Sequence, residues 1–149
     1  MEQPVPDEPR PGSYHPGWAL VCDDTASIRL LIRINLELAG FDVVEVGDGQ
    51  AALDTLRSTA DRPPGVVILD AQMEPGDGWW ATEQIRGDAR LRDLPVVMVS
   101  AALREHQRAR AGQAGVDAFV GKPFDPDALV TLVEGYATHG RSFQSVDHP

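Results

Sequence analysis

The hydrophobic residues of this chain fall into short runs that alternate with longer stretches of helical periodicity. Each run is four to six residues long and rich in branched or aromatic side chains, which is typical of β-strands. The runs occupy residues 18–22, 42–46, 66–69, 95–100 and 117–121. The first, third and fourth are apolar almost throughout, as expected for strands of a parallel sheet that is covered on both faces.

Between and after these runs, apolar residues recur at the spacing of an α-helix. Helices are predicted over residues 27–38, 49–58, 79–88, 102–115 and 125–137. The apolar positions of the first helix are expected to lie mostly on one face: Ile28, Leu31, Ile32, Leu36 and Leu38. Gly40 stands where a helix commonly ends, and Asp125 followed by Pro126 is a typical helix start.

Five strand-then-helix units in succession predict an α/β domain built on a doubly wound, five-stranded parallel sheet. We assign residues 17–138 to this domain. Residues 1–16 are proline-rich and without periodicity, so they are expected to form a flexible arm, and residues 139–149 a flexible tail.

The composition narrows the class of protein. The net charge of −10 argues against non-specific binding to nucleic acid, and no apolar run approaches the length of a membrane span. The N-terminus lacks the basic and apolar segments of a secretory signal, and the single Cys22 fits a reducing compartment. We therefore expect a cytoplasmic protein that binds neither nucleic acid nor membrane.

Polar side chains follow the predicted strands at the carboxyl edge, where ligands bind in doubly wound sheets. Asp23 and Asp24 follow the first strand, Asp70 the third, Ser100 ends the fourth, and Lys122 follows the fifth. Three crowded carboxylates repel one another unless a cation neutralises them, and hard oxygen ligands at an open site suit Mg²⁺. A phosphoryl group would complete this arrangement, with Ser100 and Lys122 contacting its oxygens.

These residues and their order resemble the receiver domains of two-component response regulators, which have a flavodoxin-like (βα)5 fold. The resemblance runs from about Trp18 to Ala137 and rests on the segments "VCDDTASIR", "VVILDAQMEPGDG", "VVMVSAA" and "FVGKPF". The intervals are also similar to those of the family: 46 residues from Asp24 to Asp70, 30 to Ser100 and 22 more to Lys122.

The resemblance implies a role for each matching residue. Asp70 would be the acceptor that attacks phosphohistidine and becomes an aspartyl phosphate. Asp24 would bind Mg²⁺ directly, Asp23 mainly through water, and Asp70 and the backbone carbonyl of Gln72 would complete the protein ligands.

The remaining matches concern the phosphoryl group and the switch. Ser100 would donate a hydrogen bond to the phosphoryl group and Lys122 would pair with it. The bond before Pro123 would be cis. Phe119 stands at the position of an aromatic switch, whose ring turns inward when the hydroxyl moves toward the phosphoryl group. One departure is Glu74, which replaces the proline of the family and adds negative charge near the metal.

Two other functions of α/β domains fit this sequence less well. A haloacid dehalogenase-type phosphohydrolase needs a second acid where Gln72 stands, and a flavin-binding flavodoxin would meet repulsion between the flavin phosphate and Asp23 and Asp24. Two alternatives remain open: a receiver-fold interaction module that works without phosphorylation, and a receiver domain excised from a hybrid histidine kinase.

The expected protein is a stand-alone receiver rather than an enzyme. The expected partners are a sensor histidine kinase, a histidine phosphotransfer protein or both, and an output protein of unknown identity. Phosphorylation would proceed from phosphodonors with Mg²⁺ and reverse by autodephosphorylation. The protein is expected to be a monomer or a phosphorylation-dependent dimer.

Overall fold

The computed structural model describes residues 17–101, 109 and 112–143. A five-stranded parallel sheet forms its centre, with the strand order β2-β1-β3-β4-β5. The strands are β1 (Trp18–Cys22), β2 (Asp42–Val46), β3 (Val66–Asp70), β4 (Val96–Ser100) and β5 (Ala118–Gly121). The predicted doubly wound α/β fold is therefore confirmed.

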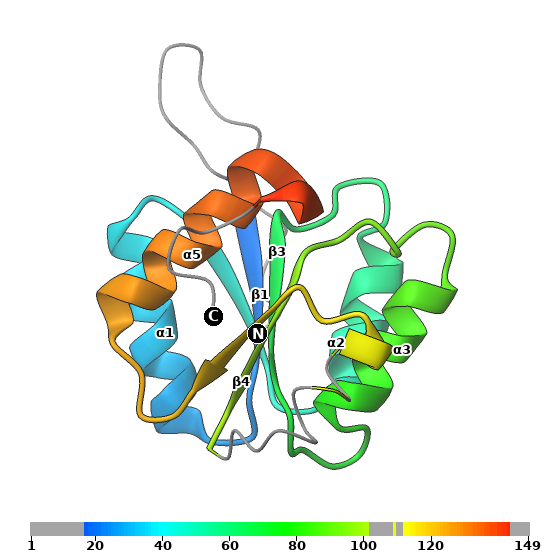
Figure 1. Cartoon of the computed structure of the whole chain (residues 1–149), viewed down its shortest axis with the longest axis horizontal. Helices are drawn as coiled ribbons and strands as arrows, with labels where there is room; N and C mark the ends of the chain where they lie inside the picture. The colour runs from blue at the N-terminus through cyan, green and yellow to red at the C-terminus, as the bar shows by residue number, and fades with distance from the viewer. Residues whose placement is uncertain (1–16, 102–108, 110–111, 144–149) are drawn as a thin grey trace.

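Helices cover both faces of the sheet (Figure 1). They are α1 (Ala26–Leu38), α2 (Gly49–Ser58), α3 (Gly78–Gly87) and α5 (Pro126–His139), with a 3-10 helix η1 (Gly140–Ser142) after the last. Helices α1 and α5 pack on one face, and α2 and α3 on the other. This arrangement leaves the carboxyl ends of the strands uncovered by helices.

The alternation of side chains along each strand divides the core into two layers. On β1, Leu20 points toward α2 and α3, whereas Val21 points toward α1 and α5. Both side chains are fully buried, as are Ile68 and Leu69, which point in opposite directions from β3. Strands that are buried on both faces have no polar face, which explains their uninterrupted apolar sequences.

Side-chain caps set the starts of three helices. The carboxylates of Asp48 and Asp77 accept hydrogen bonds of 2.8 Å from the backbone N–H groups of Ala51 and Trp80, respectively. Asp125 caps α5 in the same manner, with Pro126 at the first helical position as predicted.

The predicted apolar face of the first helix is partly wrong. Ile32 and Leu36 are buried, but Leu31 is 39% exposed and Leu38 is 81% exposed. Successive helical residues advance by about 100°, so positions 31 and 38 point at least about 100° away from positions 32 and 36. The sheet and α5 cover only the side of α1 that carries Ile32 and Leu36.

The C-terminal end of the described chain packs on the domain. Residues 139–143 were assigned to a flexible tail, yet Phe143 contacts Tyr136 of α5 with ring centroids 5.1 Å apart. Packing of one aromatic ring against another is favourable, which accounts for this contact. Most of the predicted helix 102–115, the arm 1–16 and residues 144–149 lie outside the described residues. In the described part, no helix has the length and apolar composition needed to cross a membrane.

Candidate functional site

Three carboxylates converge at the carboxyl edge of the sheet. Asp70 is the last residue of β3, and Asp23 and Asp24 directly follow the neighbouring strand β1. One carboxylate oxygen from each of the three lies within 4.8 Å of the others, so the group can hold a metal ion. Asp23 and Asp70 are buried and Asp24 is exposed, which leaves the cluster open to solvent on one side.

Lys122 brings a positive charge to this cluster. It follows β5, and its Nζ lies 2.9 Å from Asp23 Oδ2 and 3.3 Å from Asp70 Oδ2. Burial lowers the pKa of the ammonium, but the hydrogen bond to Asp23 and the charges of both acids outweigh burial, so the pKa of Lys122 is raised. The lysine is therefore fully charged at neutral pH and bridges two carboxylates.

Burial and charge also change the acidity of Asp70. Burial raises the pKa of its carboxyl group and the charge of Asp23 raises it further, although the backbone N–H of Gln72 and the Lys122 ammonium act in the opposite direction. The net effect is a raised pKa, because the desolvated acid faces another acid. A cation at this edge would relieve the repulsion.

Backbone contacts hold Asp23 in place. Its Oδ1 accepts a hydrogen bond of 2.9 Å from the backbone N–H of Thr25, and its carbonyl oxygen accepts one of 2.6 Å from the Arg29 guanidinium. Arg29 is a residue of this site that the sequence patterns do not predict. Arg29 follows Asp24 by five residues, but the sequence alone does not show that its side chain reaches back to the Asp23 carbonyl oxygen.

Ser100 lies at the end of β4, beside β3. Its side chain is buried, and its carbonyl oxygen accepts a hydrogen bond of 2.7 Å from the backbone N–H of Lys122. In the ladder between β3 and β4, the preceding residue Val99 pairs with Asp70. The structure thus brings the Ser100 hydroxyl, Lys122 and the Asp70 carboxylate to one edge of the sheet. The Lys122–Pro123 bond is cis.

The loop after Asp70 forms the wall of the site. The backbone N–H of Gln72 donates a hydrogen bond of 3.3 Å to Asp70 Oδ1. Asp24, Gln72, Met73, Glu74 and Asp77 line a surface hollow of about 550 Å³ beside the acidic cluster. Glu74 therefore borders the site, as its place in the sequence suggested, and the Glu74–Pro75 bond is cis.

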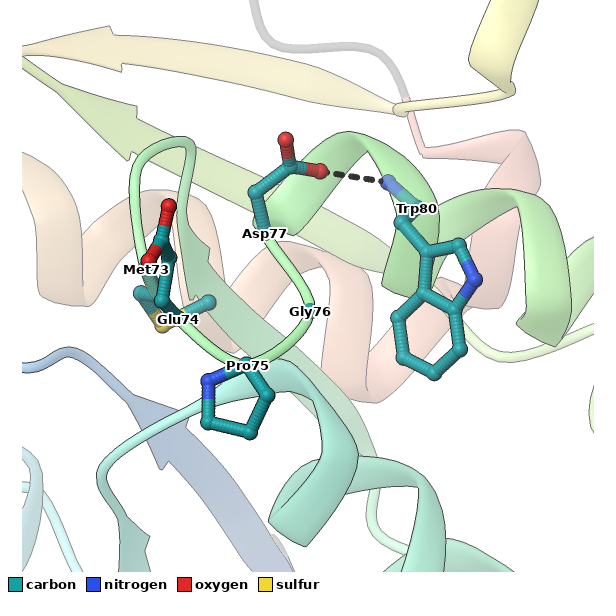
Figure 2. Close-up of a pocket in the computed structure, with 6 residues that line it drawn as sticks. All are labelled: Met73, Glu74, Pro75, Gly76, Asp77 and Trp80. Atoms are coloured by element: carbon teal, nitrogen blue, oxygen red, sulfur yellow. Dashed lines mark hydrogen bonds between the residues drawn. The ribbon is translucent and has the colours of Figure 1, made fainter.

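A second hollow adjoins the outer side of the same loop (Figure 2). Figure 2 shows the Asp77 carboxylate accepting a hydrogen bond from the backbone N–H of Trp80. The loop runs from Pro75 through Gly76 to Asp77. The indole of Trp80 also packs against the apolar layer under α2 and α3. The loop is thus bordered by open hollows but attached at several points.

Phe119 of β5 packs on α3. Its ring centroid is 6.0 Å from that of Trp79, and the planes are inclined by 43°. Trp79 is buried, whereas Phe119 is partly exposed. Sequence reasoning gave Trp79 no necessary role, because only the fold shows that residues 79 and 119 are neighbours.

The response regulator receiver domain matches residues 19–134. The chain belongs to the response regulator receiver family. The match covers the described strands and helices, apart from the first residue of β1, the C-terminal end of α5 and η1.

Curated relatives support the same assignment. The chain is 34% identical over 115 residues to the phosphate regulon transcriptional regulatory protein PhoB of Klebsiella pneumoniae, covering 77% of this chain and 49% of that protein. It is 33% identical over 110 residues to the probable transcriptional regulator ycf27 of Porphyridium aerugineum, covering 74% and 43%. The receiver chain thus spans about half the length of these relatives.

Solved structures show the same fold. A sensor protein from Polaromonas sp. JS666 aligns with a TM-score of 0.72 at 30% identity, covering 80% of this chain and 94% of that one. The signal receiver domain of a histidine kinase from Syntrophus aciditrophicus aligns with a TM-score of 0.77, covering 87% and 96%. Its identity of 24% shows the fold alone.

The residues at the receiver edge fit the Mg²⁺ that receiver domains generally bind. The cluster offers carboxylate oxygens, the ligand type that Mg²⁺ prefers, and one side of it is exposed for retained waters. The pKa of Asp70 is raised by burial first and by the charge of Asp23 second, and a cation bound at the cluster would counter the repulsion between these two acids.

Proposed function

We propose that Asp70 accepts a phosphoryl group from a phosphohistidine and that the resulting aspartyl phosphate switches a protein-interaction surface. The observation that carries this proposal is the position of Asp70. Its carboxylate is buried between the acidic pair and the Lys122 ammonium, at the edge of the sheet where Ser100 also lies. A turn-capping aspartate would need neither a second and third acid nor a bridging lysine.

The chemistry follows from these side chains. A carboxylate oxygen of Asp70 forms a bond to phosphorus while the P–N bond of a ring-protonated phosphohistidine breaks, and neutral imidazole leaves. Asp23, Asp24, Asp70 and the Gln72 carbonyl would hold Mg²⁺, which supplies positive charge for the transferring oxygens. Lys122, already within 3.3 Å of Asp70 Oδ2, supplies a further charge, and the Ser100 hydroxyl a hydrogen bond.

The switch is proposed to run through Ser100 and Phe119. When the Ser100 hydroxyl turns toward the phosphoryl group, it vacates space near β5 that the Phe119 ring can occupy. The ring then changes its contact with Trp79 and the exposed surface around β5 and α5. Phosphorylation would act by shifting the populations of these two arrangements.

The donor and the output follow from the same proposal. A sensor histidine kinase or a histidine phosphotransfer protein would supply the phosphoryl group, and an output protein would bind the switched surface. On this account the protein is a phosphoacceptor rather than an enzyme with a separate substrate. Its stand-alone character and cytoplasmic location stay predictions from the sequence.

The proposal is tested by intact mass spectrometry after incubation with phosphoramidate, a small P–N phosphodonor. The wild type should gain one phosphoryl group only with Mg²⁺, and Asp70→Asn should gain none. Asp54→Asn, an exposed substitution on α2, is the matched control and should behave as the wild type.

Two results would contradict the proposal. An adduct that survives in Asp70→Asn would place the acceptor elsewhere. If the wild type forms no adduct and binds no beryllofluoride, which mimics the phosphoryl group and does not hydrolyse, the protein is an interaction module that works without phosphorylation.

A further inference from the structure

The turn between β2 and α2 contacts the loop that borders the phosphoryl site, although it contributes no side chain to that site. The backbone N–H of Gly49 donates a hydrogen bond of 2.8 Å to the carbonyl oxygen of Gly76, and that of Gln50 donates one of 3.2 Å to Pro75. Free N–H groups at the start of a helix need acceptors, and here the loop carbonyls supply them.

Glycine is required at position 49 because the backbones approach closely. A Cβ atom at this position would overlap the carbonyl oxygen of Gly76 and lie 2.7 Å from its carbonyl carbon and 3.2 Å from the carbonyl oxygen of Asp77. The φ angle of Gly49 is not in the left-handed region, so the restriction arises from space and not from backbone conformation. Any side chain here must push the loop away from α2.

The same turn is also fixed to the strand that carries the acidic pair. The backbone N–H of Asp23 donates to the carbonyl oxygen of Val46, the last residue of β2, at 3.2 Å. The thiol of Cys22 contacts both the Asp48 carbonyl oxygen at 3.1 Å and the Met73 sulfur at 3.3 Å. These contacts join the end of β1, the β2–α2 turn and the loop after Asp70.

We propose that Gly49 is a positioning residue for the metal and phosphoryl site. Its contact with Gly76, together with the adjacent Gln50–Pro75 hydrogen bond, holds the loop at the depth where the Gln72 carbonyl and the carboxylates of Asp23 and Asp24 serve one Mg²⁺. This inference rests on the proposed function, since it concerns the same metal.

Among the described residues, the hydrogen bonds from Gly49 and Gln50 are the only ones that reach residues 74–76. The far end of the loop is fixed by the hydrogen bond from the Gly78 N–H to the Ala71 carbonyl oxygen, 3.1 Å long, which closes the loop at its base. Residues 74–76 lie beyond that base, bordered by the two hollows. Displacement of residues 74–76 would therefore shift the wall of the site, which Glu74 lines together with Gln72.

The first test is the dissociation constant for Mg²⁺, measured by tryptophan fluorescence on the full chain. Gly49→Ala should raise it by at least about tenfold, the usual effect of removing a group that orients metal ligands. The matched control is Gly87→Ala, at the exposed end of α3, where a Cβ atom meets nothing within 4 Å. It should bind Mg²⁺ as the wild type does.

Near-ultraviolet circular dichroism establishes that each variant is folded. If folded Gly49→Ala binds Mg²⁺ within about twofold of the wild type, the positioning role is overturned, because the effect of an orienting group is larger. If the wild type itself binds no Mg²⁺, the proposed function fails, which is a different result.

A measurement on the wild type covers the case in which Gly49→Ala does not fold. Coupling between two sites is reciprocal, so a contact that favours the bound metal must itself be favoured by the metal. Saturating Mg²⁺ should therefore slow hydrogen exchange at the amides of Gly49 and Gln50. Unchanged exchange at both amides would overturn the proposal.

Discussion

At the scale of single residues, the carboxylates at this edge of the sheet repel one another. Asp70 is buried near Asp23, and Lys122 contacts both acids. Burial raises the pKa of Asp70 and the charge of Asp23 raises it further, and the Lys122 ammonium does not cancel these two effects. The repulsion favours the binding of a cation and lowers the stability of the metal-free protein.

The raised pKa of Asp70 predicts that Asp70→Asn stabilises the metal-free protein. A raised pKa means that Asp70 favours folding when it is protonated, below its ordinary value of 3.8, and that this contribution is lost as the pH rises through the raised pKa. At about pH 7 the neutral amide should therefore increase the free energy of unfolding by about 1 kcal/mol.

Urea unfolding without Mg²⁺ at two pH values checks this prediction. The gain should be present at about pH 7 and shrink toward about pH 4, where the wild-type acid becomes protonated. A gain of the same size at both pH values would show that it does not come from charge. A loss at neutral pH would mean that the Lys122 contact outweighs burial and repulsion.

At the scale of elements, the hydrophobic pattern predicted where the strands and helices lie but not which faces they bury. The strand positions followed from the apolar runs, and Asp125 with Pro126 was correctly predicted to start α5. Leu31 and Leu38 were misjudged because the sequence shows which helical positions are apolar and not how wide a face the fold covers. The contact of Gly49 with Gly76 joins segments 27 residues apart, and no local pattern reveals it.

Asp117, a partly buried acid directly before β5, joins the start of this strand to three other elements. The Asp117 carboxylate accepts hydrogen bonds of 2.8 Å from Arg86 of α3, from Arg141 of η1 and from the backbone N–H of Val96. Arg86 also donates to the carbonyl oxygens of Gly115 and Leu94. Burial lowers the pKa of Arg86, which indicates that this guanidinium depends on its acid partner.

We therefore expect Asp117→Ala to lower the free energy of unfolding by about 2–3 kcal/mol, because it leaves a largely buried guanidinium without its counterion. Asp117 lies at the amino ends of the strands, so phosphorylation of the folded variant should be unchanged. Urea unfolding measures the loss, with the exposed Asp61→Ala as control. A change below about 0.5 kcal/mol, typical of a surface site, would contradict the structural role.

The contact between β5 and α3 gives a spectroscopic test of the switch. Because Phe119 lies against Trp79, beryllofluoride should change the fluorescence of Trp79 when the ring moves. The experiment uses a Trp80→Phe background, which removes the neighbouring indole. Phe119→Ala in this background should keep beryllofluoride binding and lose most of the fluorescence change. A change of equal size in Phe119→Ala would show that Trp79 reports another movement.

On the scale of the whole molecule, stability and chemistry occupy opposite edges of one sheet. The amino edge carries the Asp117 network, and the carboxyl edge carries Asp23, Asp24, Asp70 and Lys122. This separation would let the core remain fixed during the proposed change of contacts at the carboxyl edge.

The topology explains why the site could be assembled from the sequence. Parallel strands end at one edge, so residues that follow different strands must meet there, and the sheet order places β3 between β1 and β4. Contacts to backbone atoms, such as that of the Arg29 guanidinium with the Asp23 carbonyl oxygen, could not be predicted in this way. They depend on distances that only the folded chain defines.

The most direct measurement of the central claim is chemical identification of the phosphorylated residue in the wild type. Borohydride reduces an acyl phosphate to the corresponding alcohol, so an aspartyl phosphate becomes homoserine. After treatment with phosphoramidate and Mg²⁺, peptide mass spectrometry should find homoserine at position 70 and nowhere else. Homoserine at position 23 or 24, or none despite a phosphoryl adduct on the intact protein, would contradict the assignment of Asp70 as the acceptor.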